Sequence, residues 1–273
     1  MRSHSLAALG LLATFVGCAE KKPLPTFDFV AYGDGRHKES VHRKVVSNIV
    51  QTKPKFVLVT GDLVDHGNDK DLWITFRDIV KDLRSQAPYL SAAGDHDLGG
   101  EKLFEKEMGL DRLYHDRRFG DVHVFILYSG HLFSDREQVE WLEKTASASD
   151  APHKVAVFHH PPFMIDRDRG HEAEPLRASI HGVLVKLRFC AVFCGHQHAF
   201  YTTRRDGVRY VVTAGGGAPL WKLDPSLGQK GDLSRKFNHF VGLTISPGGI
   251  SARVFSADGQ EAPDLAFPLC EHR

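Results

Sequence analysis

Residues 55–65 have the sequence KFVLVTGDLVD, a short apolar run that ends in Gly61 and Asp62. A run of this length bounded by a glycine turn is typical of a strand that is buried on both faces of a sheet. Two neighbouring segments repeat the arrangement. Residues 27–36 have the sequence FDFVAYGDGR, and residues 88–97 have the sequence PYLSAAGDHD. The first 97 residues therefore contain three predicted strands, each followed by Gly-Asp.

Helices are predicted between these strands. Apolar residues recur at helical spacing over residues 39–51 and again over residues 68–85, where Asn68 is the expected N-cap. Alternating strands and helices predict an α/β fold with a mostly parallel sheet. Later in the chain we expect a helix at residues 136–146 and strands at residues 121–128, 154–158, 189–193, 208–213, 240–245 and 250–255.

The composition is that of an ordinary globular protein. Hydrophobic residues make up 42% of the 273 residues and charged residues 25%. We find no internal repeat and no domain boundary after residue 27, so residues 27–273 are predicted to form one domain. The formal net charge is +1, which gives no electrostatic reason to expect a nucleic-acid partner.

The N-terminus has the pattern of a targeting segment. Arg2 precedes an apolar run of 11 residues, 6–16, which is too short to cross the roughly 30 Å hydrocarbon core of a bilayer as a helix. Gly17 and Cys18 follow and resemble a bacterial lipobox. We therefore predict a lipoprotein signal peptide at 1–17 and a tether at 18–26. An ordinary secretory signal is the alternative.

This interpretation places the protein outside the cytoplasm. A lipid on Cys18 would anchor it to a bacterial membrane, facing the periplasm, and Ala19 resembles the residue that follows the lipidated cysteine in outer-membrane lipoproteins. Of the other cysteines, Cys190 and Cys194 lie about 13 Å apart if both are on one strand, too far for a disulfide. We expect both to be buried core residues. A bridge from either one to Cys270 is left open.

Polar clusters follow five of the predicted strands. Because the carboxyl ends of parallel strands form a common crevice, we expect these clusters to converge. Asp and His donors without thiolates suit divalent metals such as Mn, Fe or Zn. The clusters are Gly33-Asp34-Gly35-Arg36, Gly61-Asp62, Gly94-Asp95-His96-Asp97, His159-His160 and Gly195-His196-Gln197-His198.

The order of these clusters resembles the calcineurin-like metallophosphoesterase superfamily, over residues 27–268. Flanking stretches resemble most the branch that contains the purple acid phosphatases. The resemblance implies a four-layer sandwich, with two central mixed β-sheets flanked by helices. It also implies hydrolysis of a phosphate ester, in a phosphorylated small-molecule substrate, by in-line attack of a metal-bound hydroxide.

The resemblance further assigns roles to residues. It implies one or two divalent metal ions with Asp62 as the bridging ligand. The first metal would be held by Asp34 and His198, and the second by Asp95, His159 and His196. His96 would contact the scissile phosphate and protonate the leaving oxygen, while Asp97 would orient the ring of His96.

Two positions depart from the family pattern. Arg36 stands where His is usual, and Asp95 stands where Asn is usual. Arginine is a very poor metal ligand, so the first metal loses a donor, unless His37 replaces it. We hypothesise that the two changes compensate: Arg36 either pairs with Asp95 or binds a substrate phosphate. A non-catalytic lipoprotein that binds metal or a phosphorylated ligand is the alternative function.

Two further residues near the clusters receive structural interpretations. His160, which precedes two prolines, is expected to shape its loop, and Asp65 is expected to brace the loop after Asp62. Residues 164–175 and 217–236 are expected to form the substrate pocket.

Overall fold

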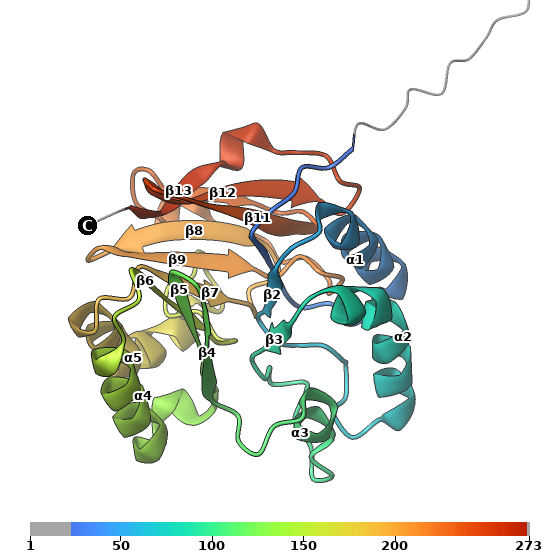
Figure 1. Ribbon diagram of the computed structural model, residues 1–273, viewed down its shortest axis with the longest axis horizontal. Coiled ribbons are helices and arrows are strands. Elements are labelled where there is room, and N and C mark those ends of the chain that lie inside the picture. Colours follow the sequence, from blue (N-terminus) through green and yellow to red (C-terminus); the bar gives the residue numbers. More distant parts are fainter. Residues whose placement is uncertain (1–22, 272–273) are drawn as a thin grey trace, which may run out of the picture.

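The computed structural model of the chain describes residues 23–271. The predicted signal peptide, Cys18 and the first part of the tether therefore lie outside the described residues. Within them, two β-sheets pack face to face and helices cover both outer faces, as Figure 1 shows. This is the four-layer sandwich that the sequence resemblance implies.

The first sheet begins with three parallel strands, in the places predicted from the sequence. Their antiparallel neighbours come from the end of the chain, so the two termini of the domain lie in one sheet. The strand order is β13 (Phe267–Glu271), β12 (Gly249–Ser256), β11 (His239–Ser246), β1 (Phe29–Tyr32), β2 (Phe56–Val59) and β3 (Tyr89–Ser91).

The second sheet has a parallel centre and antiparallel strands at both edges. Its order is β10 (Leu233–Arg235), β8 (Phe200–Arg205), β9 (Val208–Thr213), β7 (Ala191–Cys194), β6 (His153–Val157), β5 (Val122–Ile126) and β4 (His115–Phe119). The parallel strands of both sheets therefore present their carboxyl ends to the loops described below.

Helices α1 (Glu39–Thr52) and α2 (Lys70–Gln86) cover the first sheet, and α4 (Arg136–Ala148) and α5 (Ala173–Lys186) cover the second (Figure 1). The predicted N-cap of α2 is wrong by one residue. The Asp69 carboxylate, rather than the Asn68 side chain, accepts hydrogen bonds from the first turn. Shorter helices are α3 (Leu103–Met108), η1 (Gly130–Phe133), η2 (Gly170–Glu172), η3 (Pro225–Leu227) and η4 (Pro263–Leu265).

Alternating side chains along each strand divide the core into layers. In β1, Phe29 and Ala31 point between the sheets, whereas Val30 and Tyr32 pack under α1 and α2. Strand β6 shows the same alternation between the central and the outer core. Each fully buried side chain of this size contributes roughly 1.5–3 kcal/mol. Burial on both faces thus fixes the strands whose ends carry the polar clusters.

A disulfide joins the two sheets. Cys190, just before β7, is bonded to Cys270 on β13, 80 residues away in the sequence. Of the two bridges to Cys270 that the sequence left open, the one from Cys190 is formed, because its partner comes from the neighbouring sheet. Cys194 is free and buried, as expected. Within residues 23–271, none of the helices combines the length and apolar content that crossing a bilayer requires.

Removing this disulfide should destabilise the domain. Closing a loop of 80 residues in the unfolded chain is worth about 4.5 kcal/mol by the chain-entropy model. We expect a Cys190→Ser, Cys270→Ser double variant to lose about that much unfolding free energy in urea denaturation. A reductant should lower the midpoint of the unmodified protein and leave the variant unchanged. An unmodified protein indifferent to reductant would contradict the disulfide.

Candidate metal centre

Five strand ends from both sheets meet at one edge of the sandwich. Strands β1, β2 and β3 deliver the first three polar clusters, and β6 and β7 deliver the two histidine clusters. Every predicted metal ligand except Asp95 is buried, and the Asp95 side chain is 45% exposed. The convergence predicted from sequence is therefore present in the structure.

The backbone at these strand ends adopts an unfavourable conformation. Asp34, Asp62 and His196 have φ angles of 56°, 54° and 65°, in the left-handed region that costs energy for residues other than glycine. Close packing adds a second constraint, since a Cβ atom on Gly94 would lie 2.2 Å from Oδ1 of Asp62. Such strain persists where the surrounding structure imposes it, and it commonly marks functional sites.

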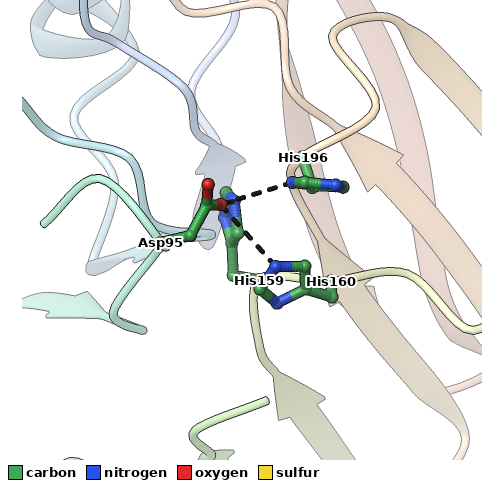
Figure 2. Close-up of side chains that lie close together, drawn as sticks. All are labelled: Asp95, His159, His160 and His196. Atoms are coloured by element: carbon green, nitrogen blue, oxygen red, sulfur yellow. Dashed lines mark ion pairs between the residues drawn. The ribbon is translucent and has the colours of Figure 1, made fainter. Parts of the chain in front are cut away.

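The donor atoms form two adjacent groups, in each of which one atom per residue lies within 4.8 Å of the others. Figure 2 shows the second group, where three imidazoles surround the Asp95 carboxylate. The first group is Asp34, Asp62 and His198, and the second is Asp95, His159, His160 and His196. Oδ1 of Asp62 lies 3.5 Å from Nε2 of His159, which places Asp62 between the two groups.

Each predicted imidazole ligand has one nitrogen engaged away from the centre. Nδ1 of His159 lies 2.8 Å from the Thr60 carbonyl, and Nδ1 of His198 lies 2.8 Å from the Pro219 carbonyl. Both rings therefore donate from Nδ1 and turn Nε2 toward the carboxylates. His196 is reversed, with Nδ1 3.3 Å from Oδ1 of Asp95. Fixing the tautomer in this way is typical of metal-binding histidines.

The electrostatics of the centre favour a bound cation. Burial alone lowers the pKa of His159, but the carboxylates of Asp62 and Asp95 raise it to about 10. For Asp62, burial raises the pKa, and the charges of His159 and Arg36 more than offset this and lower it. Within residues 23–271, Oδ2 of Asp34 is buried without a hydrogen-bond partner. Buried carboxylates of this kind, together with imidazole nitrogens, are suitable ligands for Mn, Fe or Zn.

Arg36 does not pair with Asp95. Its Nε donates to Oδ2 of Asp62 at 2.9 Å, and its Nη1 donates to Oδ1 of Asp65 at 3.0 Å. Arg36 therefore forms ion pairs with Asp62, the predicted bridging ligand, and with Asp65 instead of with Asp95. Through its contact with Arg36, Asp65 supports the loop that follows Asp62. His37 is half exposed, with Nδ1 4.0 Å from Asp65, and belongs to neither donor group.

Asp97 has a different role from the one predicted. Its two carboxylate oxygens accept hydrogen bonds from the backbone N–H groups of Asp62, Leu63, Val64 and Gly94. Burial, reinforced by the charge of Asp62, raises the pKa of Asp97 to about 7. The ring of His96 is held instead through Nδ1, 2.9 Å from the Asp65 carbonyl. Asp97 therefore positions the loops rather than the ring.

Two residues that lie in the centre were not predicted as part of it. His160 joins the second donor group, with Nε2 3.6 Å from Oδ1 of Asp95 and Nδ1 2.9 Å from Oγ of Ser129. Glu172 contacts Nε2 of His196 through Oε2 at 3.1 Å. The pair of adjacent histidines, His159 and His160, could have indicated from the sequence that His160 belongs to the centre. Nothing in the local sequence marked Glu172.

A comparison with models of known protein families shows to which family the chain belongs. The family model described as calcineurin-like phosphoesterase matches residues 38–200. The chain belongs to this family. As a calcineurin-like phosphoesterase, it has its donor clusters where the resemblance in its sequence placed them.

Individual relatives agree with this assignment. Probable purple acid phosphatase 20 of Arabidopsis thaliana is 30% identical over 169 residues, 52% of this chain and 39% of the plant protein. Probable glycerophosphodiester phosphodiesterase GpdQ of Arcobacter nitrofigilis is 25% identical, over 69% of this chain and 74% of that protein. This calcineurin-like phosphoesterase spans about half or less of the length of the plant phosphatases it matches.

A solved structure gives the same fold. Purple acid phosphatase PPD1 from yellow lupin superposes with a TM-score of 0.76 at 18% identity, over 89% of this chain and 53% of the lupin protein. At that identity the likeness establishes the sandwich and nothing beyond it.

Glu172 should support metal binding through His196. A carboxylate that accepts the outer N–H of a ligand imidazole orients the ring and raises its basicity, and losing it typically weakens metal binding by about 10- to 100-fold. We expect Glu172→Gln to raise the Kd for Mn²⁺ by that factor in chelator competition. Glu174→Gln, exposed on α5, is the matched control. Equal Kd values for Mn²⁺ in both variants would show that Glu172 does not contribute to metal binding.

Proposed function

We propose that this chain hydrolyses a phosphate ester with the help of one or two divalent metal ions. The observation that carries the proposal is the meeting of two adjacent donor groups, with Asp62 between them. Their donors come from loops separated by up to 164 positions, Asp34 to His198. Single turn-forming aspartates would not bring three imidazoles to one place with a ring nitrogen of each turned toward a carboxylate.

We propose two metal positions that bind with unequal strength. Asp95, His159 and His196 would hold one ion together with Asp62, and Asp34 and His198 would hold the other beside Asp62. Metals bound there would polarise the phosphoryl oxygens and lower the pKa of water. The guanidinium of Arg36 contacts Asp62 on the side away from His159, so we propose that the first position binds metal more weakly.

Two side chains around these positions would act on the substrate. His96 is one-third exposed beside Asp95 and would donate a proton to the leaving oxygen, with its ring held by the Asp65 carbonyl. Arg36 supplies a permanent positive charge, 13% exposed and beside Asp62, that would face a phosphate bound at the metal positions.

A second candidate function is a non-catalytic module that binds metal or a phosphorylated ligand. The observation that favours it is the Arg36–Asp62 contact, which engages an oxygen of the predicted bridging ligand. His96 argues for catalysis, because a binding module needs no proton donor.

We also propose that the protein is exported and anchored through a lipid on Cys18. The predicted signal peptide is one support, and the Cys190–Cys270 disulfide is the other, because such bonds persist in oxidising compartments such as the bacterial periplasm.

Replacing Asp62 should abolish turnover. We expect Asp62→Asn to lower kcat/KM for a chromogenic phosphate ester in Mn²⁺ by about a hundredfold or more, because the variant loses the charge shared by both metal positions. Asp71→Asn, on the exposed first turn of α2, should retain full activity. Folded protein that turns over nothing with Mn²⁺, Fe²⁺ or Zn²⁺ would instead favour the binding module.

Replacing Arg36 should strengthen the first metal position. In Arg36→His a neutral imidazole replaces the cation beside Asp62, and metal analysis at limiting free Mn²⁺ should rise from about one equivalent toward two. Arg43→His, on the exposed face of α1, should leave the stoichiometry unchanged. Two equally tight equivalents in the unmodified protein would refute the weak-site proposal.

A further inference from the structure

A cavity of about 380 Å³ opens beside the second donor group. Three residues of the second donor group, Asp95, His160 and His196, line this cavity; Figure 2 shows how these side chains lie relative to one another. Pro161, Met164 and Leu176 contribute apolar surface to the lining of the same cavity. A phosphate held at a metal between Asp95 and His196 would therefore lie beside a partly apolar space that could take a group attached to it.

The positive charge in this cavity is already neutralised. Among the described residues that line it, Arg169 carries the only permanent positive charge. Its Nε lies 2.8 Å from Oε1 of Glu172, and its guanidinium lies over the Trp221 ring at 4.0 Å from the ring centroid. An arginine held on two sides in this way offers little to a second phosphate or a carboxylate on the substrate.

The centre itself has an excess of negative charge. The centre holds the four carboxylates of Asp34, Asp62, Asp65 and Asp95, and among the described residues Arg36 is the one permanent cation that forms an ion pair with any of them. Four carboxylates less one guanidinium leave a formal net charge of −3 at the centre, with Asp97 not counted. One divalent ion, the loading proposed when the first position is weak, leaves a net charge of −1, and at that charge a phosphate dianion is repelled more strongly than a monoanion. Two divalent ions would leave +1 and reverse this order.

We propose that the substrate is a phosphate diester, a monoanion, whose second ester group is uncharged and lies in the cavity beside Asp95. This inference rests on the proposed function. In the reaction, the oxygen of water forms a bond to phosphorus and the bond from phosphorus to one ester oxygen breaks. That oxygen leaves with a proton as an alcohol, and a phosphate monoester remains.

Equilibrium binding separates charge preference from turnover. The probes are phenylphosphonate, at a pH where it is a dianion, and its monoethyl ester, which is a monoanion. Calorimetry on the protein loaded with one equivalent of Mn²⁺ should give about tenfold tighter binding of the monoethyl ester. Asp95→Asn removes one negative charge, so the preference should shrink severalfold. Equal or tighter binding of the dianion, or binding of neither probe, would overturn the diester proposal.

Turnover distinguishes this proposal from the general function. Bis(4-nitrophenyl) phosphate should be hydrolysed with a higher kcat/KM than 4-nitrophenyl phosphate, and Met164→Trp, which narrows the cavity, should reduce the diester rate more than the monoester rate. Metal-dependent turnover that favours the monoester would overturn the diester proposal and leave the phosphoesterase intact. Failure to hydrolyse either ester would count against the phosphoesterase itself.

Discussion

The buried carboxylate of Asp62 is the constraint on which the rest of the centre depends. One oxygen receives the Arg36 guanidinium, and the other accepts the backbone N–H of His96 and faces the His159 ring. Its own backbone N–H is held by Asp97. An ionised carboxylate that is 1% exposed is stable only with such partners. Loops from both sheets therefore have to meet around it.

The fold supplies this meeting point at some cost in backbone conformation. Left-handed φ angles at Asp34, Asp62 and His196 aim three donors inward from the strand ends. Burial of β1, β2, β6 and β7 on both faces holds those ends in place, and the Cys190–Cys270 bond adds a covalent link between the sheets. Rigid strands with strained loops at their ends suit a site in which donor positions must be defined closely.

Much of this was predictable because strand-end motifs are local. Apolar runs followed by Gly-Asp or by histidines placed the donor clusters correctly, from Asp34 to His198. Contacts made by long side chains between loops were not predictable. Arg36 reaches Asp62 and Asp65 rather than Asp95, and the ring of His96 is held by a carbonyl rather than by Asp97, because these outcomes depend on loop geometry. Glu172 lies on a segment without a motif, although apolar spacing at Leu176, Ile180 and Leu184 could have indicated α5.

Crystals grown with Mn²⁺ offer the most direct test of the central claim, through anomalous diffraction near the Mn absorption edge. The account predicts a strong peak bounded by Asp62, Asp95, His159 and His196, and a weaker peak or none between Asp34 and His198. A peak only at some other position, or no peak in crystals that diffract well and contain excess Mn²⁺, would contradict the assignment of this edge of the sandwich as a metal centre.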